Sequence, residues 1–162
     1  MPQTDKTANR STIEAKKVYL KDASFESPAS PQIFAKGEIK PQLDVQMTMT
    51  HQQIDKGQNY YEVVLNTTVT AAHDGENLFL AEVQQAGIFQ ITHINADNIE
   101  AALETACPHI LLPFARETMA SLISKGGFPQ LLLSPINFQA LYHRKKAREA
   151  RSVEPSGASR PN

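Results

Sequence analysis

The alternation of apolar and polar residues is clearest over residues 60–89. Two runs rich in β-branched and aromatic residues flank a polar cluster with Asp-Gly at positions 74 and 75, and this pair between two such runs is a strong signal for a β-hairpin. In the first run the apolar side chains share one face, as in a half-buried strand. In the second run Leu78 and Leu80 fall on the face opposite Phe79. We therefore expect a strand that either lies between two layers or exposes some leucine on its outer face.

Two further strands are predicted before the hairpin. Residues 11–25 contain Val18-Tyr19-Leu20, which favours extended backbone, and residues 43–49 alternate cleanly between apolar and polar side chains. A proline-rich loop separates these strands, and residues 50–58 form a polar link to the hairpin. Because no helix interrupts residues 43–89, the strands there should form an antiparallel meander.

The apolar spacing changes to three and four residues after position 89, which is typical of helices. Asp97, followed by Glu100, resembles a capping box that opens a short helix. Pro108 suits the first turn of a second helix. Pro113 must then lie near the start of that helix or kink it, because an interior proline costs about 3 kcal/mol.

The second helix should end at the Gly-Gly pair at positions 126 and 127. The next segment, residues 128–136, is apolar and bracketed by prolines, so we expect an ordered loop. Asn137 can cap a last helix, whose packing should end near Tyr142 because the following residues are polar and mostly basic.

Length and charge point to one folded domain with two tails. The 162 residues, 41% of them hydrophobic, support one core, which we place in residues 11–142, after a disordered leader over residues 1–10. Residues 143–162 hold six Lys or Arg and two Glu, a net charge of +4, so the overall charge of −1 leaves −5 for residues 1–142. We expect this basic tail to be mostly disordered. The acidic body argues against a nucleic-acid partner.

The single cysteine, Cys107, cannot form an internal disulfide, which favours a reducing compartment. No apolar run reaches the roughly 18 to 20 residues of a spanning helix, so we expect a cytoplasmic protein without membrane insertion.

The sequence offers little catalytic chemistry. It has no glycine-rich phosphate-binding loop, and its five histidines are scattered. Cys107 and His109 are close in sequence, but two side chains are too few for a structural zinc site. A structural cysteine is favoured, and a thiol enzyme is the weaker alternative. We therefore expect no enzyme, no metal and no cofactor.

Several segments resemble, in order, the SecB family of bacterial protein-export chaperones. The similarity runs from about Ile13 to Tyr142. The segments that carry it are Tyr19–Glu26, Tyr61–Leu65, Phe79–Phe89, Cys107–Leu111, Pro113–Glu117, Gly127–Leu131 and Pro135–Leu141.

This resemblance implies an α+β fold, with a four-stranded antiparallel sheet and helices packed on one face, assembled as a dimer of dimers. It also implies an ATP-independent cytoplasmic chaperone that holds unfolded preproteins in a translocation-competent state and delivers them to the SecA motor of the Sec pathway. A long apolar groove can collect many weak contacts with an extended client, without a cofactor.

The resemblance also implies roles for particular residues. Positions corresponding to the family's SecA contact, which faces a basic zinc-binding tail of SecA, are Asp22, Glu26, Leu80 and Glu82. Positions corresponding to its subunit contacts are Phe79, Ala81, Val83 and Gln85. For the client groove we name Phe128, Leu131 and Leu133.

Two features depart from the family. The C-terminal tail is basic instead of acidic or neutral, and the loop before residue 43 lacks a tryptophan. The basic tail leaves room for an additional anionic partner. The alternative function is a SecB-like chaperone dedicated to one client, such as the antitoxin of a stress-response toxin-antitoxin module. The four positions of the SecA contact favour the export role, since such a specialist does not need them.

Overall fold

The structure, a computed structural model, describes residues 10–153. The elements are β1 (Thr12–Glu26), a short 3-10 helix η1 (Gln32–Ala35), β2 (Gln42–Asp55), β3 (Tyr60–His73), β4 (Glu76–Thr92), α1 (Ala96–Glu104), α2 (Ala106–Lys125) and α3 (Phe138–Ser152). The expectations for the leader up to residue 9 and for the chain after residue 153 lie outside the described residues.

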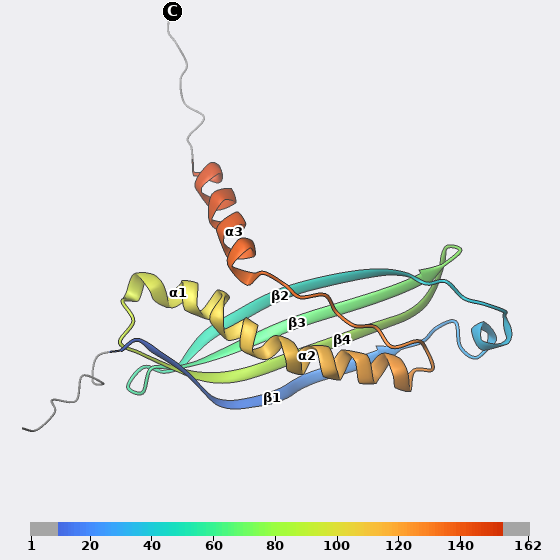
Figure 1. The fold of residues 1–162 in the computed structure, drawn as a ribbon, viewed down its shortest axis with the longest axis horizontal. Helices are drawn as coiled ribbons and strands as arrows, with labels where there is room; N and C mark the ends of the chain where they lie inside the picture. The colour runs from blue at the N-terminus through green and yellow to red at the C-terminus, as the bar shows by residue number, and fades with distance from the viewer. Residues whose placement is uncertain (1–9, 154–162) are drawn as a thin grey trace, which may run out of the picture.

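The four strands form one antiparallel sheet in the order β1-β4-β3-β2 (Figure 1). The β3–β4 turn is tight because Asp74 (φ 48°) and Gly75 (φ 78°) both adopt the left-handed conformation that a two-residue hairpin turn requires. Strands β2, β3 and β4 form the predicted meander, and β1 adds to the free edge of β4. The α+β class and the four-stranded antiparallel sheet are therefore confirmed.

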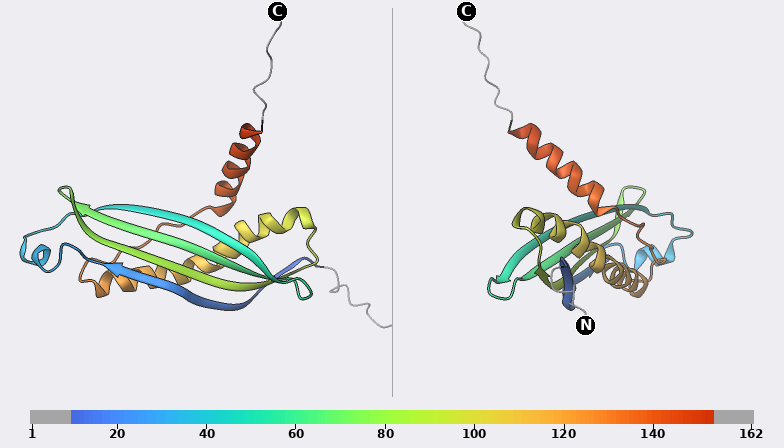
Figure 2. Two further views of the ribbon diagram at one scale, coloured as in Figure 1. Left: turned by 180° about the vertical axis from the view of Figure 1, so that it is seen from behind. Right: turned by 60° about the vertical axis from the view of Figure 1, so that its left-hand side comes forward.

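Helix α2 lies along one face of the sheet, over β4 and β3, and α1 precedes it (Figures 1 and 2). We call this the covered face. Two apolar clusters fill the space beneath the helices, one around Val83 and Met119 and the other around Phe89 and Leu111. The opposite face, which we call the open face, carries no helix in the part of the chain that the structure describes. The helices thus pack on one face, as predicted.

The sheet and α2 approach closely at Gly87 on β4. A Cβ atom there would lie 2.7 Å from the Phe89 ring and 3.0 Å from Leu111 Cδ2. Real Cβ atoms essentially never approach other atoms that closely. A glycine at this position therefore allows Phe89 and Leu111 to fill the core.

The expectation that Leu78 is exposed is wrong. Leu78 is fully buried, whereas Leu80 is half-buried on the open face. The β3–β4 register pairs Ala71 with Phe79 and Ala72 with Asn77, which leaves Leu78 as the extra residue of a β-bulge. A bulge changes the direction of a side chain relative to strict alternation, so Leu78 joins the core.

Two element boundaries differ from the prediction, and Pro113 takes the second of its two predicted positions. Strand β2 continues to Asp55 because pairing with β3 satisfies its backbone, and polar side chains are tolerated at a sheet edge. Helix α1 begins at Ala96 with Asn95 as its N-cap, so Asp97 lies in the first turn and does not cap. Pro113 lies well inside α2.

The other helix signals are confirmed. Pro108 lies in the first turn of α2, and Gly127 (φ 87°) follows its end. Residues 128–136 are irregular, and Asn137 Oδ1 accepts a hydrogen bond from the Ala140 amide at 3.0 Å. The tail is more ordered than expected, because α3 extends to Ser152 and contacts α1 beyond Tyr142.

Candidate functional site

The four residues expected to contact SecA come together on the open face. Asp22 and Glu26 lie on β1, and Leu80 and Glu82 lie on the adjacent strand β4. The register pairs Glu26 with Leu80 and Ser24 with Glu82, and directly opposed side chains in a sheet have Cβ atoms about 4.5 to 5.5 Å apart. We call these four residues the acidic patch.

The acidic patch consists of three exposed carboxylates and a half-buried leucine, with Leu80 paired to Glu26 at one end and Asp22 at the other. Within residues 10–153, no Lys, Arg or His side chain forms an ion pair with Asp22, Glu26 or Glu82. Its nearest polar contact is a weak hydrogen bond from Ser24 Oγ to Glu82 Oε2, at 3.5 Å. The patch therefore presents uncompensated negative charge with an apolar side chain at one end, which is suited to a basic partner.

A second set of polar residues on the open face is internally neutralised. Glu62 on β3 accepts hydrogen bonds from Tyr19 Oη, from Lys21 Nζ at 2.9 Å and from Gln52 Nε2 at 3.1 Å. The hydrogen bond from Tyr19 and then that from Lys21 lower the pKa of Glu62. Burial and the neighbouring Glu62 raise the pKa of Tyr19 to about 12.

This network lay beyond sequence reasoning, because its members come from β1, β2 and β3. Tyr19 pairs with Ala86 on the intervening strand β4 and reaches across it to Glu62. Strand alternation in the sequence indicates the face of the sheet on which each residue lies. Only the pairing register of the strands shows that Tyr19 is close to Glu62.

The residues expected to contact another subunit are buried by other parts of the same chain. Phe79, Ala81, Val83 and Gln85 lie on the covered face and are at most 4% exposed. The first three belong to the core beneath α2, and Gln85 Nε2 donates to the Tyr19 carbonyl at 3.0 Å. Their role as direct contacts with another subunit stays a prediction. The alternation placed them on one face correctly, but α2 covers that face.

The expected client residues differ from one another in exposure. Phe128 and Leu133 are each 6% exposed and belong to the core, and Leu131 is half-buried. Leu133, like Phe128, therefore offers little open apolar surface. Its neighbour Leu132 is 71% exposed. Sequence reasoning missed Leu132 because an irregular loop has no periodicity that separates inward from outward side chains.

Phe128 forms one wall of a small groove of about 250 Å³. The groove lies between the loop before β2 and the end of α2, and Phe34 lies opposite, with ring centroids 5.3 Å apart. Phe34 is 49% exposed. The groove therefore offers an aromatic surface that opens to solvent.

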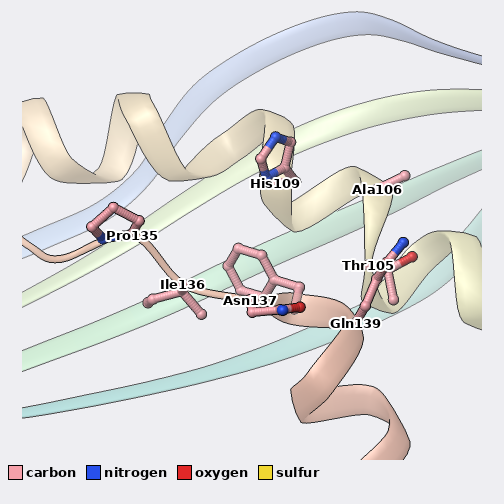
Figure 3. Close-up of a pocket in the computed structure, with 8 residues that line it drawn as sticks. Thr105, Ala106, His109, Pro135, Ile136, Asn137 and Gln139 are labelled. Carbon is pink, nitrogen blue, oxygen red and sulfur yellow. The ribbon is translucent and has the colours of Figure 1, made fainter.

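A larger groove, of about 620 Å³, lies where the start of α2 meets the start of α3 (Figure 3). Thr105 and His109 come from the helical side, and Pro135 and Ile136 from the loop. It contains no cluster of acids or nucleophiles. Within residues 10–153, no group of three or more His, Cys, Asp or Glu is arranged to hold a metal ion.

Cys107 is not placed for nucleophilic chemistry. Its side chain is fully buried, and burial raises the pKa of its thiol to about 12. The thiol is therefore protonated at neutral pH, whereas nucleophilic attack needs the thiolate. The structure thus supports a structural role for Cys107.

Together, these observations define an α+β protein with a four-stranded antiparallel sheet, helices on one face and an acidic patch on the other. The family described as preprotein translocase subunit SecB matches residues 6–149. The chain belongs to the SecB family of protein-export chaperones. No helix of residues 10–153 is long and apolar enough to span a bilayer.

Relatives from two bacteria are similar over nearly the whole chain. A protein-export protein SecB of Chromobacterium violaceum is 46% identical over 134 residues, which are 83% of this chain and 87% of the relative. A protein-export protein SecB of Chromohalobacter salexigens is 42% identical over 148 residues, which are 90% of this chain and 88% of the relative.

A solved structure has the same fold at low sequence identity. It is a SecB-like chaperone of Mycobacterium tuberculosis in complex with a peptide from an antitoxin, with a TM-score of 0.62 and 14% identity. The match covers 77% of this chain and 91% of that one. This likeness supports the fold and carries no information on the client of the present chain.

Proposed function

We propose that this chain is an ATP-independent chaperone of the cytoplasm that holds unfolded preproteins and delivers them to the SecA motor. The observation that carries the proposal is the acidic patch, where residues distant in sequence meet on the open face without a cationic partner among the described residues. A fold that needed these carboxylates for its own stability would pair them. Their exposure fits a role in recognition.

The acidic patch would bind a basic segment of SecA. Charge complementarity across an interface raises the association rate and selects the partner, while the leucine supplies apolar contact area. Leu80 pairs with Glu26 in the register and lies two residues from Glu82, so it adjoins two of the three carboxylates. Binding of SecA would therefore depend on four side chains that contribute little to the core.

The client would bind next to α2, on the part of the covered face formed by the edge strand β2, which the helix does not reach. Leu43 and Val45 on the edge strand β2 are each 42% exposed there, facing the same way as the core residues Ala71 and Val69 with which they pair. Leu132 adds apolar surface from the loop.

The aromatic groove of Phe34 and Phe128, with the half-buried Leu131, would extend this client surface. Apolar burial contributes roughly 25 cal/mol per Å², so several small patches can together hold an extended chain without selecting one sequence. Leu133 would support the loop from the core instead of contacting the client.

We further propose a homotetramer, arranged as a dimer of dimers, with contacts through the outer side of α2. Phe114 is 48% exposed in the middle of this helix. On a different side of the helix, Arg116 lines a groove of about 470 Å³, and its buried Nε has no hydrogen-bond partner among the described residues. Buried donors are nearly always paired, and an acceptor from a second subunit would satisfy this one.

The holding activity is tested by light scattering without nucleotide. A reduced, unfolded secretory protein is diluted with and without the purified chain. We expect a larger, soluble complex and suppressed aggregation, and a tetramer before the client is added. Aggregation of every client tested would contradict the proposal, and protection of one client alone would support a dedicated chaperone instead.

The acidic patch is tested by Glu82→Lys. We expect SecA binding to be lost while client holding is kept, because the side chain is exposed and lies outside the core. Glu14→Lys is the matched control, since Glu14 is an exposed acid at the opposite end of β1 from Glu26. Unchanged SecA affinity in Glu82→Lys, or equal losses in both variants, would refute the assignment.

A further inference from the structure

Helix α3 carries positive charge on two different sides. On the inner side, Lys145 Nζ lies 2.6 Å from Glu104 Oε1 and Lys146 Nζ lies 3.1 Å from Glu100 Oε2, which ties α3 to α1. The remaining cations follow each other at steps of four and three residues and so share one side of the helix. We call them the arginine stripe: Arg144, Arg148 and Arg151.

The arginine stripe is narrow and points away from the lysines. With 3.6 residues per turn, it spans about 60° of the helix circumference, centred roughly 140° from the midpoint of Lys145 and Lys146. All three arginines are exposed. Helix α3 itself stands away from the sheet (Figures 1 and 2), so the stripe can reach a partner before the body does.

The charge of the stripe is not neutralised within residues 10–153. No carboxylate there forms an ion pair with its arginines. Glu149, the one acid of α3, lies 3.6 Å from Lys146 Nζ instead. Three guanidinium groups without a carboxylate partner therefore project from a chain whose first 142 residues carry a net charge of −5, and Arg144 Nε makes only a weak hydrogen bond, at 3.4 Å, to the Ala140 carbonyl.

We propose that the arginine stripe binds the phosphate groups of anionic lipids at a membrane surface. Guanidinium groups match phosphate oxygens with two parallel hydrogen bonds. A straight, narrow stripe contacts a flat array of anions along its whole length. Contact is peripheral, because α3 has no continuous apolar face that could enter the bilayer.

The same geometry disfavours nucleic acid. Nucleic-acid binding needs a basic face on the folded body, and residues 1–142 carry a net charge of −5. The inner side of α3 is neutralised by Glu100 and Glu104. The chain also has no aromatic residue after Tyr142 on which bases could stack.

This inference adds a partner to the proposed function and does not depend on it. The acidic body would be held away from the anionic surface, with α3 as the contact. Neither the acidic patch nor the client surface takes part, so client holding, measured on the same proteins, reports separately on the proposed function.

The experiment measures co-sedimentation of the full chain with vesicles. One set contains equal parts of phosphatidylglycerol and phosphatidylcholine, and the other contains phosphatidylcholine alone. Each arginine near an anionic surface contributes about fivefold to partitioning, so Arg144→Gln, Arg148→Gln and Arg151→Gln together should weaken binding by about a hundredfold. Replacing the same three residues by lysine should keep most of the binding, and added salt should weaken it.

The matched control removes three exposed lysines of the body by Lys17→Gln, Lys56→Gln and Lys125→Gln. This variant has the same net charge as the arginine-to-glutamine variant, and we expect it to bind the anionic vesicles like the unchanged protein. Equal losses in both variants, or no binding by the unchanged protein, would overturn the proposal. Tighter binding to duplex RNA at equal phosphate concentration would also overturn it.

Discussion

The two faces of the sheet are built from the same strands but differ in what their side chains do. On the covered face of β4, Phe79, Ala81 and Val83 are at most 2% exposed and lie beneath α2. Between them on the open face stand the half-buried Leu80 and the exposed Glu82. Alternate residues of one strand can therefore serve stability and recognition separately, and substitutions on the two faces should have different consequences.

The largest expected effect is on the covered face, from Phe89→Ala. Phe89 is fully buried against α2, and truncating a buried Phe to Ala costs about 3 to 5 kcal/mol. Urea unfolding at one fixed protein concentration measures the loss. The free energy of unfolding of Glu82→Ala, on the open face, should stay within about 0.5 kcal/mol of that of the unchanged protein. Similar losses in both variants would contradict the difference between the two faces.

Close packing on the covered face predicts a smaller loss for Gly87→Ala. The added methyl group would collide with Phe89 and Leu111, and such overpacking costs about 1 to 3 kcal/mol. Gly37→Ala is the matched control, since nothing lies within 4 Å of a Cβ there. The free energies of unfolding of both variants are compared with that of the unchanged protein. An unchanged value for Gly87→Ala would show that α2 can move away from the sheet.

Charge pairs at the rim of the covered face should stabilise the attachment of α3 without a large effect on the whole fold. Glu104 is buried and accepts from Lys145 of α3, with His51 of β2 3.4 Å away. Glu104→Gln weakens this link, so the amides of α3 should exchange with solvent faster. Glu100→Gln should change exchange less, because its pair with Lys146 is about half exposed on both sides and such pairs contribute at most about 1 kcal/mol. The reverse order would contradict this account of α3.

The smallest effect is expected on the open face, as a pH dependence. The pKa of Glu62 lies below its ordinary value of 4.5 because Tyr19 and Lys21 donate to its carboxylate. The unfolded chain therefore binds more protons in that range. The contribution of Glu62 is present above pH 4.5 and is lost as the pH falls through the lower pKa of the folded state.

Stability measured between neutral pH and pH 3 should reveal this contribution. Glu62→Gln should flatten the acid side of the curve, and Tyr19→Phe should do so in part, since Lys21 remains. An unchanged acid side in Glu62→Gln would show that the hydrogen bonds do not favour the carboxylate.

The sequence predicted what local patterns determine. The Asp-Gly turn and the alternation of β3 set the hairpin, and the proline and glycine signals set the limits of α2. These features follow from backbone preferences within a few residues. The acidic patch was also found, because its members resemble a known family and strand alternation placed Leu80 and Glu82 on one face.

The features that the sequence did not predict depend on the pairing register of the strands and on which face of the sheet the helices cover. The bulge that buries Leu78 arises from pairing with β3, and the Tyr19–Glu62 contact spans three strands. Gln85 and Val83 were placed on one face correctly, but only the position of α2 shows that this face is closed. Long-range geometry of this kind has no signature in local periodicity.

The central claim is that SecA docking and client holding use different surfaces, and one paired measurement tests it most directly. SecA affinity and suppression of client aggregation are measured for Glu82→Lys and for the double variant Leu43→Ser, Val45→Ser. We expect Glu82→Lys to lose SecA and keep the client, and the double variant to do the reverse. Loss of both activities in both variants, with the fold intact, would contradict the account.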